Sequence, residues 1–348
     1  QSSKLILYIS STVITAYLMS ATNTVDSEEQ VEIDESLPEA LDTLLKKHAK
    51  HKGFNTKTPV YILMDDYFLN MQRITLNDIQ LKTLHQVIDI EIDNINDFLW
   101  DVELAEQEVK GKHTALVFLL KKEIANEIEV AIKKHGLTVK SISPRYLATK
   151  TLIKKEQFKI EHQQVNALID ISDTRARLFF ILNNKIKLYR RITFKKIEQK
   201  KKGDLDPIKE AFKAIIPLYR TAKDQYISRY TNQDIHKIYM TSDIQDIKKI
   251  DIKIDTKTVM QIEDHIDQKN IKYPDRFRYV YGYINAIQDK QKFNIIPYQQ
   301  RLEIKIIKTI ARAAGAILFC ICLWAGGNAL ELKKEFKFLG LMSNGKNS

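Results

Sequence analysis

Acidic and hydroxyl side chains follow two of the apolar runs, where they could hold a metal ion. Asp65-Asp66 comes directly after one run, and Asp170 with Asp173 comes after another, with Ser172 between them. Carboxylates and neighbouring oxygen atoms are the ligands that Mg²⁺ prefers. The simpler interpretation, which we favour, is that these are exposed acids of two turns.

The histidines give no comparable signal for a metal site or for catalysis. The chain has eight, scattered along the sequence, and no pair has metal-ligand spacing together with an acidic partner. His48 and His51 lie three residues apart at the end of a predicted helix, among lysines, which favours capping of the helix dipole over metal binding. The sequence also lacks G-x-S-x-G, G-K-S/T and paired-carboxylate patterns.

The chain is basic, with a net charge of +11 over 348 residues. Such a balance is typical of proteins that bind nucleic acid, anionic lipid or an acidic protein. The densest basic cluster, residues 195–202 (KKIEQKKK), has no interleaved aromatic residue on which a base could stack. We interpret it as a solvated loop near lipid, with a nucleic-acid patch as the alternative.

Two stretches predict β-hairpins, one at the start of each half of the chain. Residues 5–19 and 165–180 each contain an apolar strand, a polar Ser/Thr turn and a second strand. Residues 5–19 also follow Lys4 and could be the apolar region of a signal peptide. Ser10-Ser11-Thr12 interrupts that region in the middle, so we favour the hairpin.

Alternating strands and helices follow each hairpin. Further strands are predicted at 59–64, 71–76, 98–104, 114–120, 137–143, 186–194 and 235–241, with a loop or edge strand at 26–35. Helices are predicted at 38–51 (capped by Ser36), 77–90, 121–135 (ended by Gly136), 146–153, 206–226 (kinked at Pro217) and 279–287. This order predicts two α/β lobes, residues 1–155 and 156–292.

Residues 313–330, AAGAILFCICLWAGGNAL, carry no charge in a sequence that is 28% charged. A bilayer core of ~30 Å needs about 20 apolar residues, within a range of roughly 17–25. Arg301 and Arg312, with two lysines between them, fit a cytoplasmic flank, and Trp324 suits the opposite interface. The stretch predicts a transmembrane helix; a buried helix of a soluble domain is the alternative.

The anchor also divides the end of the chain. Residues 293–312 are predicted to be a juxtamembrane linker and helix, and residues 331–348 a short segment on the far side. Gly315 and the pair Gly326-Gly327 are small enough for close helix approach, which favours self-association in the membrane, although they could equally face lipid. The basic body before the anchor is then expected in the cytoplasm.

At this level the sequence resembles the actin-like assembly proteins of type IV pilus and type II secretion machines, the PilM-like and GspL-like proteins. The resemblance rests on LILYISSTVITAYL at 5–18, on VNALIDISDTRARLFFILNNKIKLYRRITF at 165–194, and on FNIIPYQQR at 293–301. The last segment is similar to the N-L-L-P cytoplasmic tail of the PilN-type partner, or to the pre-anchor segment of the GspL type. The resemblance implies a two-lobed actin-like fold of the actin, sugar kinase and Hsp70 kind. It makes Asn294, Ile295, Ile296 and Pro297 candidates for contact with a partner or the membrane.

Nucleotide-binding members of that fold place glycine in the phosphate turns, because backbone amides must approach the phosphates. Here Tyr8 and Ser10 stand where an acid and a glycine are expected, and the second turn keeps Asp170 but has Ser172. The third position has Ser242-Asp243 in place of a glycine pair. The degenerate site comprises Tyr8, Ser10, Ser11, Thr12, Asp170, Ser172, Asp173, Thr174 and Ser242. We therefore expect neither ATP nor Mg²⁺ as a cofactor, and no ATPase activity.

The resemblance implies a non-catalytic scaffold of a bacterial inner-membrane platform. Such a protein would dock a hexameric secretion or pilus ATPase, contact membrane lipid and a PilN- or GspM-like bitopic protein, and form a homo-oligomer. The alternative is an actin-like ATPase that polymerises or switches at the membrane. A membrane-tethered nucleic-acid binder is a third class, and we expect no nucleic-acid partner.

Overall fold

The computed structural model describes residues 3–34, 36–51, 54–105, 111–197, 206–230, 233–244, 251–266, 271–289 and 293–295. All of them belong to a unit that spans residues 1–296, and residues 297–348 form a second unit. The predicted anchor, with Ile296, Pro297, Arg301, Arg312, Gly315 and Trp324, lies outside the described residues. Among those that are described, no helix is both long and apolar enough to cross a bilayer.

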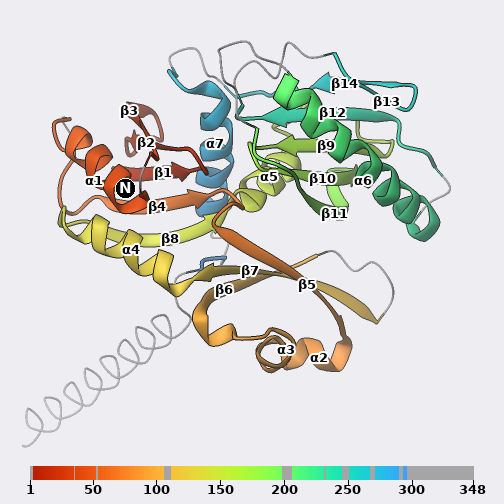
Figure 1. Cartoon of the computed structure of the whole chain (residues 1–348), viewed down its shortest axis with the longest axis horizontal. Coiled ribbons are helices and arrows are strands. Elements are labelled where there is room, and N and C mark those ends of the chain that lie inside the picture. Colours follow the sequence, from red (N-terminus) through yellow and green to blue (C-terminus); the bar gives the residue numbers. More distant parts are fainter. Residues whose placement is uncertain are drawn as a thin grey trace, which may run out of the picture. The chain divides into compact units, whose positions relative to one another are not determined.

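The first large sheet has five strands in the order β3-β2-β1-β4-β8 (Figure 1). These are β1 (Lys4–Ile9), β2 (Val13–Met19), β3 (Val25–Glu32), β4 (Pro59–Met64) and β8 (Thr138–Pro144). Every residue of β2 is buried, which explains the unbroken apolar run that predicts it. Helices α1 (Leu37–His48), capped by Ser36, and α4 (Lys122–Lys133) lie side by side and share the core of this sheet. The predicted hairpin and edge strand are confirmed.

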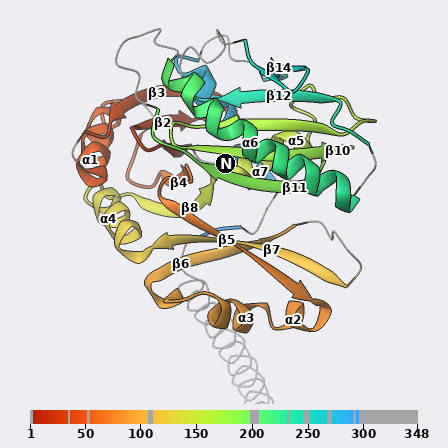
Figure 2. The same ribbon diagram turned by 45° about the vertical axis from the view of Figure 1, so that its right-hand side comes forward.

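The second large sheet repeats the first, with the order β11-β10-β9-β12-β14-β13. Its strands are β9 (Asn166–Ile171), β10 (Arg175–Leu182), β11 (Lys185–Thr193), β12 (Lys237–Ser242), β13 (Lys253–Ile254) and β14 (Lys257–Gln261). Helix α6 (Asp206–Tyr230) crosses one face of it, and Phe180 stacks against Tyr219 and Tyr226 in the core between them (Figure 2). The first four strands have the same order in both sheets, as the predicted repeat implies.

A third, three-stranded sheet was not predicted as a separate layer. It has the order β5-β7-β6, from β5 (Leu69–Asn77), β6 (Phe98–Leu104) and β7 (Lys112–Lys121), and has its own small core. The segment predicted to be helical at 77–90 is helical, but it forms two short helices. Asn77 caps α2 (Asp78–Lys82). Thr83 has non-helical dihedral angles, φ −112° and ψ 30°, and separates α2 from α3 (Leu84–Glu91). The 3₁₀ turn η1 (Ile95–Asp97) follows.

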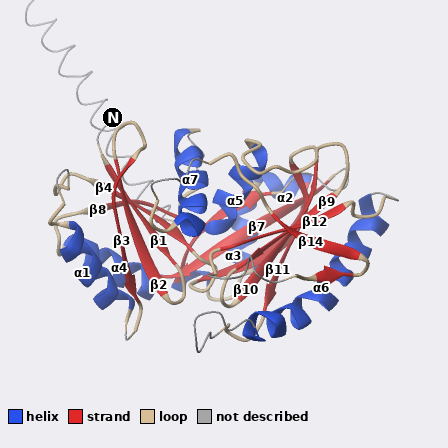
Figure 3. Cartoon of the chain, turned by 90° about the horizontal axis from the view of Figure 1, so that it is seen from above, coloured by secondary structure: helices blue, strands red, loops and turns tan. Residues whose placement is uncertain are grey.

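Helices α5 (Arg145–Lys154) and α7 (Pro274–Gln288) lie between the two large sheets (Figure 3). They approach so closely that a Cβ on Gly282 would lie 2.6 Å from the carbonyl oxygen of Ala148. The apolar side chains of α7 belong to a core that contains side chains of both large sheets. This crossing brings Tyr279 of α7 close to Arg145 of α5, at the position where the two halves meet.

Candidate functional site

The two Ser/Thr turns have the same backbone hydrogen bond and contact each other. Ser10 N donates to the Val13 carbonyl at 2.9 Å, and Ser172 N donates to the Arg175 carbonyl at 2.8 Å. Across the gap between the halves, Ser11 Oγ donates to the Asp173 carboxylate. The turns that open the two halves therefore meet face to face, and the residues around them form one cluster.

Arg145 is the centre of this cluster. Its guanidinium is fully buried and donates from Nε to Asp170 Oδ2 at 3.2 Å, with a second bond from Nη2 to Oδ1 of the same carboxylate. Nη1 donates to Asp243 Oδ1 at 2.7 Å, to the Tyr8 hydroxyl at 2.7 Å and to Asp65 Oδ2 at 3.4 Å. One side chain thus joins groups from both halves.

A second buried arginine completes the ionic network. Arg177 donates from Nε to Asp66 Oδ2 at 2.9 Å and from Nη2 to Asp65 Oδ2 at 2.8 Å. Its Nη1 lies 3.6 Å from Asp170 Oδ2. Asp65 and Asp170 are therefore shared between the two arginines, and each arginine links a residue of the first half to one of the second.

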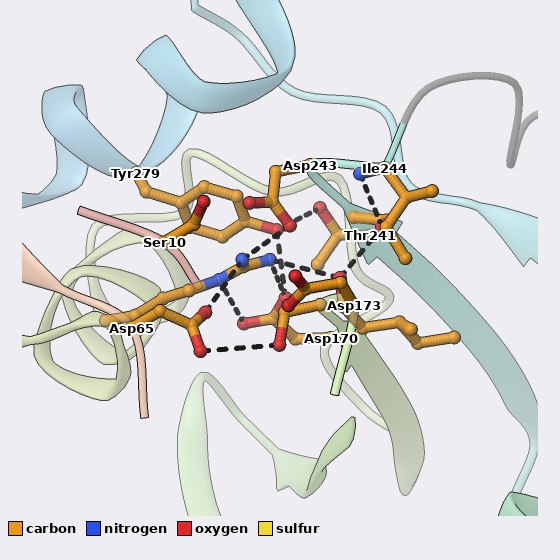
Figure 4. Close-up of polar contacts among 12 residues, drawn as sticks. Ser10, Asp65, Asp170, Asp173, Thr241, Asp243, Ile244 and Tyr279 are labelled. Carbon is orange, nitrogen blue, oxygen red and sulfur yellow. Dashed lines mark hydrogen bonds and ion pairs between the residues drawn. The ribbon is translucent and has the colours of Figure 1, made fainter. Parts of the chain in front are cut away.

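Two tyrosines close the cluster on the side of α7. The Arg145 guanidinium lies 3.7 Å from the centre of the Tyr279 ring, and the Tyr279 hydroxyl donates to Asp170 Oδ1 at 2.9 Å. Tyr8 donates to Asp243 Oδ2 at 2.7 Å and stacks on Tyr279 with a centroid distance of 6.2 Å. Figure 4 shows the carboxylates of Asp65, Asp170, Asp173 and Asp243 converging beside the Tyr279 ring.

The favoured interpretation of Asp65-Asp66 and Asp170 as exposed turn acids is wrong. All three side chains are inaccessible to solvent. Asp65 and Asp66 follow β4, and Asp170 lies near the end of β9, where the two halves meet, so the opposite half covers all three. Buried carboxylates are found where a cation or hydrogen-bond donors compensate them, and here the two arginines do so.

The electrostatics of the cluster follow from burial and this pairing. Burial opposes the charged form of Asp243, yet the Arg145 guanidinium holds the pKa of its carboxyl below the usual range. Burial raises the pKa of Asp66, and the neighbouring Asp65 adds to the shift. Burial also raises the pKa of Asp173 to about 6, and the negative charges of Asp65 and Asp243 act in the same direction. Further cations around the cluster favour the charged carboxylates: Arg175 and Arg191 act on Asp66, Arg276 on Asp243 and Lys196 on Asp173.

The residues present do not fit the phosphates of a nucleotide. The amides of Ser10 and Ser172 already donate within their own turns, and Ser10 Oγ accepts from Val13 N at 3.1 Å. Arg145 and Arg177 direct their donors to the carboxylates of Asp65, Asp66, Asp170 and Asp243. A polyphosphate placed here would find these donors already bonded and would meet the negative charge of the carboxylates.

The other residues predicted for the site lie at its margin. Thr12 and Thr174 contribute to the turns through their carbonyls, which accept from Ile33 N at 2.7 Å and Phe194 N at 3.1 Å. Ser242 Oγ donates to the Ile171 carbonyl at 2.8 Å. Within the part of the chain that the structure describes, no group of three or more acidic, histidine or cysteine side chains could hold a metal ion.

Sequence reasoning missed Arg145, Arg177 and Tyr279. A usable signal was present for Arg177, which stands in an otherwise apolar run (RARLFFIL) of a strand with a buried interior. An arginine at such a position needs a buried carboxylate partner. Asp65-Asp66 and Asp170, at the ends of apolar strands, were the available candidates. Arg145 gave no such signal, because it stands at the start of a helix directly after Pro144.

The histidine interpretation also needs correction. His48 is fully buried, and burial together with the neighbouring His51 lowers its pKa to about 4. It is neutral at neutral pH and cannot act as a charged cap of the α1 dipole. The lysines Lys46 and Lys47 occupy the last turn of α1 and supply positive charge there.

Two of the residues predicted to contact a partner or the membrane are described. Asn294 and Ile295 lie against β8, beside the third sheet, and not in the cluster around Arg145. Phe293 packs with its ring edge-on to Phe118 of β7 at a centroid distance of 5.5 Å. This second region is therefore distinct from the turns of the two large sheets.

Comparisons with known proteins support the fold. No protein-family model and no curated protein matches the sequence. The structure is similar to a PilM-PilN type IV pilus biogenesis complex, with a TM-score of 0.57 and 13% identity over 80% of this chain and 96% of that one. It is also similar to the cytoplasmic domain of EpsL, an inner membrane component of the type II secretion system of Vibrio cholerae. There the TM-score is 0.50 with 15% identity, over 86% of this chain and 99% of that one. At such identities the similarity shows the fold: this chain has the two-lobed α/β actin-like fold of these pilus and secretion proteins, as the sequence resemblance predicted.

Proposed function

We propose that this protein is a non-catalytic scaffold of an inner-membrane assembly platform of the type II secretion or type IV pilus kind. Both similar structures come from such machines, and one of them is an inner membrane component. The scaffold docks a hexameric cytoplasmic assembly ATPase and couples it to a PilN- or GspM-like bitopic membrane protein. It uses no nucleic acid and needs no nucleotide of its own.

One observation carries the non-catalytic part of this proposal. The position between the lobes is occupied by the Arg145 guanidinium, which is fully buried and bonded to Asp65, Asp170 and Asp243. An enzyme of this fold opens and closes around a nucleotide, whereas buried ion pairs that join both halves favour a single arrangement of the lobes. A body held in one arrangement is suited to passing force from a partner's motor.

The membrane part of the proposal rests on the sequence. Residues 313–330 are proposed to cross the bacterial inner membrane once and self-associate there, with the basic body on the cytoplasmic side near anionic lipid. In this view residues 1–155 and 156–292 form the two lobes, 293–312 lead to the membrane, and 331–348 lie beyond it.

The test of the catalytic question is isothermal titration of the full chain in detergent with Mg-ATP. We expect no binding heat, because donors and space at the lobe interface are already taken. Micromolar binding that the Asp170→Ala variant abolishes would overturn the proposal and favour an actin-like ATPase.

The test of the docking role is co-purification of the tagged full chain from bacterial membranes in detergent. We expect recovery of a hexameric ATPase and of a bitopic membrane protein, in amounts that persist after a high-salt wash. Their repeated absence would contradict the platform role while leaving the result of the nucleotide titration unaffected.

A further inference from the structure

A groove runs between α1 and α4, which cover the face of the first large sheet opposite α7 (Figure 3). Its volume is about 650 Å³. Acidic side chains of both helices line it: Glu39 and Asp42 from α1, and Glu123 and Glu127 from α4. Lys134 is the only cation among the described residues of its lining. The groove is therefore acidic, although the whole chain has a net charge of +11.

The acids of this groove differ in how far they are already paired. Asp42 bonds to Lys46 at 2.6 Å and to His135 at 2.9 Å, so its charge is compensated within the chain. Among the described residues, no ion pair or hydrogen bond involves the carboxylates of the other three, Glu39, Glu123 and Glu127. These side chains are exposed and available to cations of a partner.

Another side of α4 shows how an acid is paired within one helix. Glu129 pairs with Lys133, four residues later, at 2.8 Å. Glu127 instead has Ala131 at that spacing, and Glu123 has Glu127, a second negative charge. Like charges four residues apart destabilise a helix. The two acids of α4 that line the groove therefore repel each other unless a cation from outside the helix lies between them.

An apolar strip accompanies the acids. Val130 is 60% exposed and lies three residues after Glu127, on the same side of α4. Ala131 is buried and also lines the groove, as does Pro38 of α1. A partner's aliphatic side chain that packs on this strip is removed from water together with the exposed valine, which favours binding.

This pattern selects among the classes of partner. Anionic lipid headgroups and the phosphates of nucleic acid are repelled by the unpaired carboxylates, whereas lysine and arginine side chains are attracted. A groove with an apolar strip is also where one face of an amphipathic helix packs, with anchors at i, i+3, i+4 and i+7. The two features together specify a helix whose aliphatic face is bordered by cations.

We propose that the groove between α1 and α4 binds a cationic amphipathic helix of another protein. Aliphatic side chains of that helix pack on Val130 and Ala131, and its lysines or arginines pair with Glu39, Glu123 and Glu127. The site lies on the opposite face of the first sheet from α7 and requires no nucleotide. It therefore goes beyond the proposed scaffold role and can fail independently of it.

The test measures binding of a fluorescent designed peptide, KALKKLAKALKKLA, to the full chain in phosphatidylcholine nanodiscs. The leucines of this peptide form one helical face, and its lysines border that face. Anisotropy titrations against empty nanodiscs give the background. We expect the native chain to bind this peptide, and not to bind the same peptide with every lysine replaced by glutamate.

The matched pair of variants is Glu127→Lys and Glu129→Lys, which make the same change of charge on different sides of α4. Glu127→Lys should weaken binding about tenfold, and Glu129→Lys no more than about twofold. Val130→Glu adds a negative charge to the groove, but it should still weaken binding about threefold, because it removes the apolar contact. Circular dichroism should show the native helix content in all three variants, since none of these side chains is buried.

Three results would overturn the proposal. These are absence of binding to the native chain, equal weakening by Glu127→Lys and Glu129→Lys, and tighter binding to Val130→Glu, which would mean that charge alone attracts the peptide. Light scattering without peptide tests a different occupant. An oligomer that dissociates on Glu127→Lys but not on Glu129→Lys would assign the groove to a second copy of this chain. No readout depends on ATP or on an assembly ATPase, so failure here and failure of the proposed function are distinguishable.

Discussion

The turn that follows β1 and the turn that follows β9 have the same backbone but different side chains. With Ser10 aligned to Ser172 by their identical turn hydrogen bonds, Tyr8 corresponds to Asp170 and Ser11 corresponds to Asp173. The next parallel strands extend the correspondence. Ile9 pairs with Met64 and Ile171 with Ser242, so Asp65 and Asp243 occupy equivalent positions just past β4 and β12.

Arg145 lies where these equivalent positions meet. It bonds to Asp65 and Asp243, the pair in which both halves keep an acid, and to Tyr8 and Asp170, the pair in which they differ. The first half supplies a hydroxyl where the second supplies a carboxylate. The two halves are thus asymmetric around Arg145, which, like Arg177, contacts acids of both halves.

The largest expected loss of stability follows removal of the Arg145 guanidinium, which contacts both halves. Arg145→Met leaves Asp170 and Asp243 buried without their main partner and removes the longer of the two arginine contacts of Asp65. We expect the free energy of unfolding to fall by about 3–5 kcal/mol. Urea unfolding followed by the loss of the β-sheet circular dichroism signal measures it. Arg145→Lys, which keeps the charge but not the planar fork, should recover part of the loss.

The matched control is Arg220, an arginine of α6 that forms an exposed ion pair. Arg220 donates to Asp255 at 2.8 Å from a side chain that is 56% exposed. Arg220→Met should cost no more than about 1 kcal/mol. Similar losses for Arg145→Met and Arg220→Met would contradict the view that Arg145 holds the halves together.

The next prediction compares Asp170 with Tyr8, the corresponding positions at which the two halves differ. Asp170→Asn removes the charge that faces both arginines and should cost roughly 2–4 kcal/mol. Tyr8→Phe removes one hydroxyl between Arg145 and Asp243 and should cost about 1–2 kcal/mol. The same urea titration measures both variants, and an equal or larger loss for Tyr8→Phe would reverse the asymmetry that we infer.

How far the fold could be predicted depends on whether the signal is local. The hairpin of β1 and β2 is evident because both strands are buried runs bounded by a polar turn, and α4 is evident because its apolar residues repeat at helical period before Gly136, which adopts a φ of 71°. The third sheet could not be predicted as a separate layer. The apolar pattern identifies β5, β6 and β7 as strands, but which sheet a strand joins depends on partners distant in the sequence.

The candidate site shows the same limit. The turns and their missing glycines could be predicted, because residue type alone decides whether an amide can approach a phosphate. The side chain that lies between the two turns could not be predicted. Arg145 bonds to Asp65 and to Asp243, which come from opposite halves of the chain, and nothing near Arg145 in the sequence indicates that it will be buried. A single charged residue at a helix start usually faces solvent.

The last comparison concerns the third pair of corresponding positions, Ser11 and Asp173, which bond to each other. Burial raises the pKa of Asp173 to about 6, from 3.8 in the unfolded chain. Between these values the folded protein binds more protons than the unfolded one. The contribution of Asp173 to stability should therefore be greatest below about pH 4, fall as the pH rises toward 6, and stay constant above that.

Asp173→Asn removes the carboxylate that is costly to ionise there. We expect it to abolish this slope and to raise the free energy of unfolding at pH 7.5 by roughly 1–3 kcal/mol. Ser11→Ala, which deletes the bond that stabilises the charged form of Asp173, should steepen the slope instead. Asp255→Asn is the control. Burial opposes the charged form of Asp255, but the interactions with Arg220 and Lys223 prevail and lower its pKa. Removal of this carboxylate should therefore destabilise the protein slightly. Urea titrations from pH 4 to 8 measure all three variants. If Asp173→Asn were less stable than the native chain at pH 7.5, the Asp173 carboxylate would stabilise the folded protein, as Asp170 does. That result would contradict our inference that the acid at this position is destabilising, whereas Ser11 at the corresponding position of the first half is not.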